Sequence, residues 1–480
     1  MEKKNTWETY DAKHLKKLEK LCQEYREFLN QGKTERECID TIVNTVEEAG
    51  YRELDSVIKS GESLKTGDKI YRVWMNKSIV MFQIGEKSLT EGMNILGAHI
   101  DSPRLDVKQN PLYEDGGFAY LDTHYYGGVK KYQWVTIPLA IHGVVVKKDG
   151  TTVEINIGEN EDDPVFFVSD LLIHLAQEQL EKKAAKVIEG EALDIIIGNK
   201  PLVMEGKKSD KVTKKDQEEE KNAGKDAVKA GILKILKDNY DMEEEDFLSA
   251  ELEVVPAGKA REAGFDRSMI LAYGQDDRVC AFTSLKAMLD TPVTQRTTCC
   301  ILVDKEEIGS VGATGMQSHF FEDAVAEVMN LLGEYSELNV RRCLSHCCML
   351  SSDVSSAYDP AYGASFDKKN VAYLGGGMVF NKFTGSRGKS GSNDANAEYI
   401  AHLRHIFEEK KINFQTAELG KVDLGGGGTI AYILALYGMN VIDSGVAVLN
   451  MHAPWEATSK ADIYETYRGY KAFAEGASLS

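Results

Sequence analysis

Three short, almost wholly apolar segments in the second half of the chain restrict what it can fold into. They span residues 298–303, 343–350 and 446–451. Uninterrupted apolar runs of this length are typical of strands buried on both faces, as in sheets covered by helices. Segments with helical spacing alternate with them, at residues 324–332, 393–410, 429–437 and 460–474. The pattern therefore predicts an α/β fold, with a mixed sheet flanked by helices.

A change of pattern in the first half predicts a second structural unit. At 480 residues the chain exceeds what one hydrophobic core usually supports. Strand-like runs, a helical stretch and a further strand follow one another at residues 136–146, 153–157, 169–185 and 193–197. We expect a β-rich domain at 110–263, inserted into a discontinuous domain formed by 1–109 and 264–480. Residues 205–226, nearly all charged or small, are expected to form an exposed mobile loop.

Charge and hydropathy exclude several classes of partner. A formal net charge of -19 argues against a nucleic-acid partner, because phosphate binding requires basic surface. No stretch approaches the roughly 18 apolar residues of a membrane span. The first residues are charged but lack a following apolar segment, so we expect no secretory signal and a cytoplasmic location. The 8 cysteines include adjacent pairs within apolar runs, which favours free thiols over disulfides.

Metal-ligand side chains recur at or just beyond the ends of the predicted strands, where open α/β sheets bind their ligands. They lie in residues 97–104, 274–278, 304–310, 351–354 and 450–456. Taken singly, each has an ordinary explanation: a structural histidine, a turn, a helix cap or surface charge. Taken together, carboxylates that recur after apolar strands would be costly to bury without partners. A pair of divalent metal ions removes that cost.

The order and wording of these five segments resemble the M18 metallopeptidases, the aspartyl aminopeptidase and aminopeptidase I group. The resemblance covers most of the chain and is carried by residues 276–285, 306–310 and 451–452. It implies a zinc-peptidase α/β domain interrupted by a β-rich dimerisation domain, in a homo-oligomer that forms a tetrahedral dodecamer. It also implies hydrolysis of the N-terminal peptide bond of short peptides.

Carried over residue by residue, the resemblance implies two metal ions that share one ligand. Asp276 becomes the bridging carboxylate. One ion would also bind His99 and Asp353, and the other Glu307 and His452. Imidazole and carboxylate ligands suit zinc, with cobalt or manganese as alternatives, whereas an all-oxygen set would indicate magnesium or calcium.

The resemblance also implies roles in catalysis. Glu306 becomes the general base for a water that bridges the metal ions, and Asp101 the carboxylate that orients His99. Neighbouring residues of a strand point to opposite faces, so Glu306 and Glu307 can share a site only if the strand has already ended. Related zinc peptidases carry a cis peptide bond after the bridging aspartate, which here is the bond between Asp276 and Asp277.

Candidate substrate-binding residues are Lys389, Asp170, His174 and Gly427. Lys389 matches a family lysine near the substrate, although a surface lysine explains it equally well. The glycine-rich turn that contains Gly427 precedes a helix and could receive a carboxylate, but it lacks the pattern of a phosphate loop. Asp170 and Ser356 stand where we expect histidines in aspartyl-specific members, which favours neutral or basic N-terminal residues over acidic ones.

Two other functions remain open from the sequence. A metal-dependent amidase or deacylase of the same fold would act on an acylated amino group. A catalytically inactive shell or binding homologue would keep the fold, although retention of every ligand and of Glu306 speaks against it. His402 and His405 have the spacing of a metal clip on a helix, but they lack nearby carboxylates and are expected at the surface.

Overall fold

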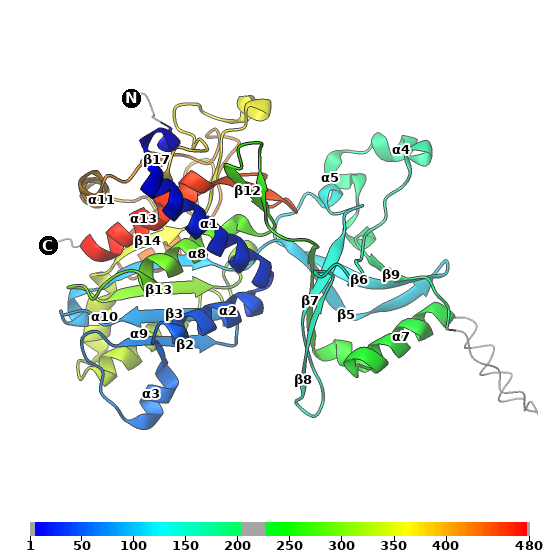
Figure 1. Ribbon diagram of the computed structural model, residues 1–480, viewed down its shortest axis with the longest axis horizontal. Helices are drawn as coiled ribbons and strands as arrows, with labels where there is room; N and C mark the ends of the chain where they lie inside the picture. The colour runs from blue at the N-terminus through cyan, green and yellow to red at the C-terminus, as the bar shows by residue number, and fades with distance from the viewer. Residues whose placement is uncertain (1–4, 203–225, 478–480) are drawn as a thin grey trace, which may run out of the picture. The chain divides into compact units, whose positions relative to one another are not determined.

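The computed structural model describes residues 5–202 and 226–477 and divides into two compact units (Figure 1). Unit 1 comprises Met1–Ser102 and Lys259–Ser480, and unit 2 comprises Pro103–Gly258. The insertion thus begins and ends a few residues before the expected limits of 110 and 263. The charged segment 205–226 lies almost wholly outside the described residues.

Unit 1 is built on a nine-stranded mixed sheet, in the order β1-β2-β3-β13-β4-β14-β18-β16-β17. Its strands are β1 (Arg52–Glu53), β2 (Lys69–Trp74), β3 (Ser78–Gln83), β4 (Asn94–His99), β13 (Thr298–Val303), β14 (Cys348–Ser352), β16 (Met378–Asn381), β17 (Phe414–Thr416) and β18 (Asn440–Gly445). A five-stranded sheet has the order β11 (Arg261–Ala263), β12 (Met269–Ala272), β20 (Glu456–Ser459), β19 (Ala447–Leu449) and β15 (Ser355–Ser356).

Helices cover both faces of the large sheet, so its central strands are buried on both sides. One core contains side chains of α1 (Ala12–Gln31), α2 (Glu35–Glu48), α8 (Gln275–Leu289), α11 (Ala397–Lys410) and α13 (Lys460–Gly476). The other contains side chains of α3 (Leu54–Ser60), α9 (Phe320–Leu331), α10 (Glu337–Ser345) and α12 (Ala431–Ala435). Strand alternation sends Cys300 into the first core and Cys299 into the second, which keeps these adjacent thiols apart. The predicted mixed sheet flanked by helices is confirmed.

The central strands of the large sheet bring several of the predicted site segments to one edge of unit 1. Strand β4 is parallel to β13 and to β14. The carboxyl ends of these three strands therefore meet at the same edge, with His99 ending β4 and Asp353 following β14 directly. Residues 306–308 follow β13 after a short turn. This arrangement positions the candidate site.

Three predictions of secondary structure are wrong. Residues 343–350 do not form one strand: Cys343 lies on the buried face of α10, whose amphipathic pattern resembles an apolar run locally, and β14 begins at Cys348. Residues 446–451 contribute β19 to the small sheet, while the neighbouring strand of the large sheet is β18, which contains the buried polar Asp443 and Ser444. Residues 169–185 form separate short turns instead of one helix.

Unit 2 contains a six-stranded antiparallel sheet, in the order β8-β7-β10-β5-β6-β9. Its elements are β5 (Arg104–Asp115), β6 (Phe118–Tyr126), β7 (Leu139–Val146), β8 (Thr152–Ile157), β9 (Ile195–Gly198), β10 (Ala250–Pro256), α4 (Gln177–Leu180), α5 (Ala184–Val187) and α7 (Ala227–Tyr240). Short 3-10 turns at Thr6–Thr9, Leu89–Glu91, Lys131–Gln133, Ile173–Leu175, Gly190–Ala192, Glu244–Ser249, Glu306–Ile308 and Pro360–Ser365 complete the described elements of both units.

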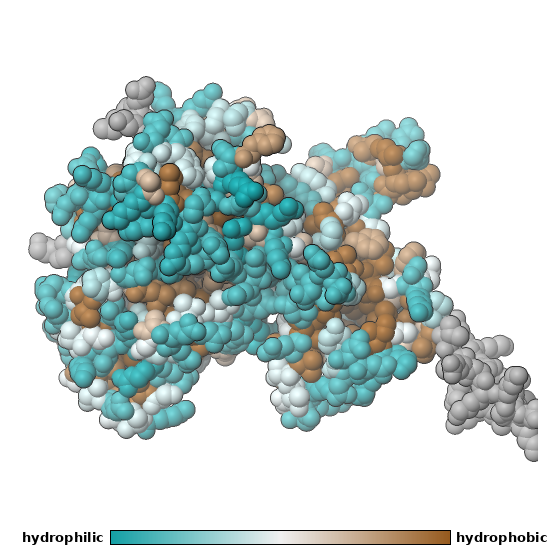
Figure 2. All heavy atoms as spheres, in the orientation of Figure 1, coloured by the Kyte–Doolittle hydropathy of each residue, from teal (hydrophilic) through white to brown (hydrophobic). Residues whose placement is uncertain are grey.

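The turns at 171–180 in unit 2 leave large aliphatic side chains in contact with solvent. Leu172 is 54% exposed, Ile173 67%, Leu175 67% and Leu180 66%. Figure 2 shows the resulting hydrophobic surface over α4. Contiguous apolar surface of this kind is typical of a protein interface. Among the described residues, no helix is long and apolar enough to cross a membrane.

Candidate metal centre

Asp276 lies between two histidines that come from distant parts of the chain. Its Oδ1 is 3.4 Å from Nε2 of His99, and its Oδ2 is 3.2 Å from Nε2 of His452. Asp276 stands at the start of α8, where the backbone is not yet helical and the peptide bond to Asp277 is cis, as expected. A carboxylate whose two oxygens face different imidazoles has the geometry required to bridge two cations.

Two further carboxylates complete two groups of possible metal ligands that share Asp276. Ligand atoms of His99, Asp276 and Asp353 lie within 4.8 Å of one another, as do those of Asp276, Glu307 and His452. The Oε2 of Glu307 is 3.4 Å from Nε2 of His452. Its Oε1 is buried without a hydrogen-bond partner, which is costly unless a cation compensates it. The structure thus brings together all five predicted ligands, in the predicted two groups.

Asp101 organises the site through three contacts. Its Oδ1 lies 3.1 Å from Nδ1 of His99, which leaves Nε2 of that ring directed at Asp276. The same carboxylate accepts backbone hydrogen bonds from Glu306 and Glu307, each 3.1 Å long. This resolves the difficulty of two adjacent glutamates in one site, because strand β13 ends at Val303 and both residues lie in a short 3-10 turn.

Glu456 is a second buried carboxylate that supports the site, and sequence reasoning gave it no role. Its Oε2 accepts the backbone N–H of Asp276 at 3.0 Å, and its Oε1 accepts that of His452 at 2.8 Å. Glu456 is 1% exposed. It begins β20, four residues after His452, so only its place in the same sequence segment could have drawn attention to it. It ties together two backbone segments that carry ligands.

In the metal-free chain, burial and contacts with neighbouring groups shift the pKa values of these carboxyl groups in different directions. Burial raises the pKa of Glu306 to about 7, and raises the pKa values of Glu307 and Asp353 well above their usual range. Burial has the same tendency at Asp276, but hydrogen bonds with His452 and His99 outweigh it and hold the pKa of Asp276 below its usual value. Asp276 is therefore the carboxylate that stays ionised most readily.

A cavity of about 430 Å³ opens beside these residues. Glu306 lines it together with Asp276, Glu307, Asp353 and His452. Its remaining lining residues are Gly309, Ser310, Val354, Asn381, Thr384, Leu419, Gly426, Gly427, Gly428, Thr429, Tyr432 and Met451. Most of them belong to the predicted site segments or to the glycine-rich turn. Sequence reasoning missed Asn381, Thr384, Leu419 and Tyr432, because no ligand-like motif marks them. The cavity gives a substrate access to Glu306.

The predicted substrate-binding residues lie in different places. Gly427 lines the cavity. Lys389 is exposed, 2.9 Å from Asp394 Oδ2, and is not among the described residues that line the cavity. Asp170 and His174 are exposed residues of unit 2, whereas the metal-ligand groups belong to unit 1. The structure thus supports a place in the site for Gly427 among these four residues.

Comparison with known proteins identifies the family. Residues 28–474 match the family model of the aminopeptidase I zinc metalloproteases (M18). The "Probable M18 family aminopeptidase 1" of Clostridium acetobutylicum is 61% identical over 98% of both chains. The crystal structure of an M18 aminopeptidase from Thermotoga maritima matches with a TM-score of 0.91, at 42% identity and 100% coverage of both chains. That of aminopeptidase I from C. acetobutylicum matches with a TM-score of 0.89, at 58% identity, covering 99% of this chain and 100% of the other. The chain therefore belongs to the M18 family of zinc metalloproteases and is a metal-dependent aminopeptidase.

Proposed function

We propose that this aminopeptidase removes the N-terminal residue of short peptides with two divalent metal ions bound around Asp276. The observation that carries the proposal is that the two carboxylate oxygens of Asp276 face different histidines, His99 and His452. His99 and Asp353 would complete one metal site, and Glu307 and His452 the other.

The donor set fits zinc, with cobalt or manganese as alternatives. Each group combines one imidazole with two carboxylates, which suits borderline-soft ions better than magnesium or calcium. The buried Oε1 of Glu307, which has no hydrogen-bond partner, is satisfied once a cation is bound. Two divalent ions held by these residues would supply Lewis acidity, which lowers the pKa of a water molecule and polarises the carbonyl of the scissile bond.

Glu306 is the proposed general base. It lines the cavity, and its Oε2 lies 3.9 Å from Nε2 of His99, close to the ligand groups without belonging to either. Oε2 takes the proton of the attacking water and returns it to the leaving amine. Asp101 accepts a hydrogen bond from the backbone N–H of Glu306 and contacts the ring of His99. It is therefore a positioning residue for Glu306 and His99.

The resemblance in sequence further supports a homo-oligomer, with unit 2 as the dimerisation domain. The free, buried cysteines of the described residues favour the cytoplasm as its location. The exposed aliphatic side chains at 171–180 supply apolar surface for such contacts. One solved neighbour of the fold, S. cerevisiae mApe1, at 18% identity, forms a dodecamer. Asp170 and His174 stay proposed substrate contacts on the resemblance in sequence. Lys389 stays a proposed substrate contact on the resemblance alone.

Substitution Glu306→Gln tests the proposal. We expect kcat on aminoacyl-nitroanilides to fall by a factor of about 100 to 10,000, the usual contribution of a general base. Metal content, measured by atomic absorption, should remain at two ions per chain, because Glu306 is not a proposed ligand. N-acyl amino acids, the substrates of a deacylase, should not be hydrolysed. Unchanged hydrolysis by the variant would exclude Glu306 as the base.

A further inference from the structure

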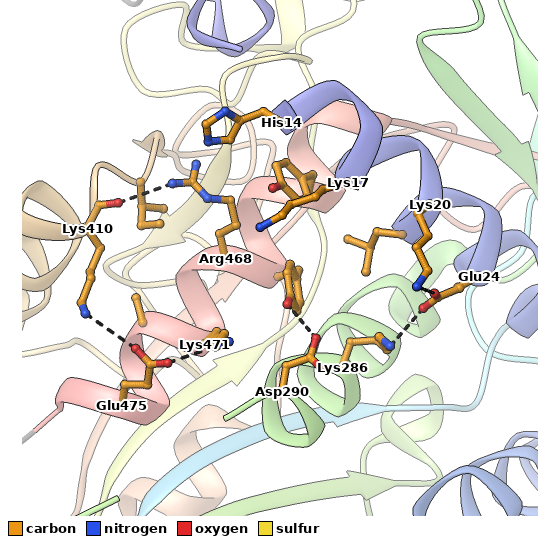
Figure 3. A pocket seen from close by; sticks show the side chains of 15 residues that line it. His14, Lys17, Lys20, Glu24, Lys286, Asp290, Lys410, Arg468, Lys471 and Glu475 are labelled. Atoms are coloured by element: carbon orange, nitrogen blue, oxygen red, sulfur yellow. Dashed lines mark hydrogen bonds and ion pairs between the residues drawn. The ribbon is translucent and has the colours of Figure 1, made fainter. Parts of the chain in front are cut away.

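A second cleft in unit 1, of about 540 Å³, is lined by basic side chains and shares no lining residue with the metal centre (Figure 3). Helices α1, α8, α11 and α13 contribute to it. Six lysine and arginine side chains line it against three carboxylates. The whole chain carries a net charge of -19, so the charge of this cleft is opposite in sign to that of the chain as a whole. Such a local reversal attracts anions.

Ion pairs leave the cleft with an excess of positive charge. Glu24 lies 3.7 Å from Lys20 and 3.0 Å from Lys286. One carboxylate is therefore shared by two ammonium groups, and each such triad keeps a net positive charge. The shorter contact restricts the side chain of Lys286, which is only 24% exposed, and so lowers the entropy that this side chain loses when an anion binds.

A second triad repeats this pattern on another side of the cleft. Glu475 lies 3.6 Å from Lys410 and 4.0 Å from Lys471. Figure 3 shows the two triads on different sides of the cleft, with Lys17 between them. Among the described residues Lys17 forms no ion pair within 4.0 Å. Ammonium groups distributed in this way match a ligand with several negative charges along a chain better than a ligand with one negative charge.

Arg468 and aromatic rings extend the cleft. The Arg468 guanidinium lies 5.9 Å from the centre of the Tyr464 ring, and Tyr464 stacks on Tyr467. Arg468 is held by an ion pair to the buried Glu465 at 2.6 Å, so it is rigid but partly neutralised. Lys17 and the two lysine triads therefore supply most of the uncompensated positive charge of the cleft.

We propose that this cleft binds a multivalent phosphate chain, either inorganic polyphosphate or the phosphate groups of a nucleotide. Lysine ammonium groups bind phosphate as point charges, and several of them around an open cleft accommodate successive phosphates. The binding is independent of the proposed function, because neither metal ligands nor Glu306 take part in it.

The test measures binding of sodium tripolyphosphate to the metal-loaded full chain by titration calorimetry. The variant Lys17→Gln/Lys471→Gln removes two charges from the cleft. The matched control Lys13→Gln/Lys16→Gln removes two exposed charges from α1 that do not line it. We expect the first variant to bind at least about tenfold more weakly and the control to change by less than about twofold. Tripolyphosphate bound at the metal ions is common to all three proteins and cancels in the comparison.

Three further arms complete the test. Added salt should weaken binding, because exposed charges are screened. ATP binding more tightly than tripolyphosphate would support a nucleotide, and equal affinities would support the phosphate chain alone. Equal weakening in both variants, no binding at low salt, or tighter binding of a glutamate-rich peptide would overturn the proposal. In those cases the lysines serve only to offset the neighbouring carboxylates and helix ends. Unchanged melting temperatures confirm that the variants are folded.

Discussion

Replacement of Glu456 by glutamine should weaken the metal centre, although Glu456 is not a proposed ligand. Its carboxylate accepts two backbone hydrogen bonds, from Asp276 at 3.0 Å and from His452 at 2.8 Å. Glutamine can accept one of them with its carbonyl oxygen, but its NH₂ group then faces the other N–H donor. Burial raises the pKa of Glu456 to about 8 in the metal-free chain, and bound cations favour its ionised form. In that form a hydrogen bond to the carboxylate contributes about 1.5–3 kcal/mol, and one of the two is lost in the variant.

We therefore expect zinc affinity to fall by a factor of about 10 to 100, since about 1.4 kcal/mol corresponds to a factor of ten. Competition with a chromophoric chelator measures the affinity. Thermal unfolding with metal present should show a lower melting temperature. Glu62→Gln is the matched control, because Glu62 is 56% exposed and, within residues 5–202 and 226–477, its ion pair is with the exposed Arg52 alone. A Glu456→Gln affinity within about twofold of the unsubstituted chain would refute the reasoning.

Three further perturbations test the site. A Cβ on Gly445 would lie 1.9 Å from the Asp353 carbonyl oxygen, so Gly445→Ala should displace Asp353 and lower metal content, while Gly388→Ala, with open space around its Cβ, should not. Burial raises the pKa values of Glu307 and Asp353, so without metal the folded chain binds more protons than the unfolded chain at neutral pH. The metal-free fold therefore loses stability as pH rises above the ordinary carboxyl range. The drop in melting temperature on chelation should be larger at pH 8 than at pH 6, and an equal drop would contradict this. Burial raises the pKa of Glu306 to about 7 without metal, and bound cations lower it. As pH is lowered, kcat/KM should therefore fall with a midpoint below pH 7, because Glu306 becomes protonated. A kcat/KM that stays constant below pH 7 would argue against Glu306 as the base.

The fold class and the candidate metal ligands could be predicted from the sequence, the ligands with the help of its resemblance to a known family. Buried strands such as β13 consist of apolar residues, and proposed ligands lie at or just after the ends of such strands, as His99 and Asp353 do. Such local patterns can be recognised in the sequence without knowledge of the tertiary structure. Where buried polar residues occupied a central strand, as Asp443 and Ser444 do in β18, the signal was lost and the strand was missed.

Other features depend on contacts between residues far apart in the chain, and no local pattern encodes them. Asp101 meets the backbone of Glu306 across 205 positions, and Glu456 meets that of Asp276 across 180. The basic cleft exists only because α1 and α13 pack side by side, which gathers Lys17 and Lys471 on one surface. Residue type and spacing therefore indicate which groups can bind a metal. Only packing of the chain sets which carboxylate supports them and where positive charge accumulates, because both depend on distances in space.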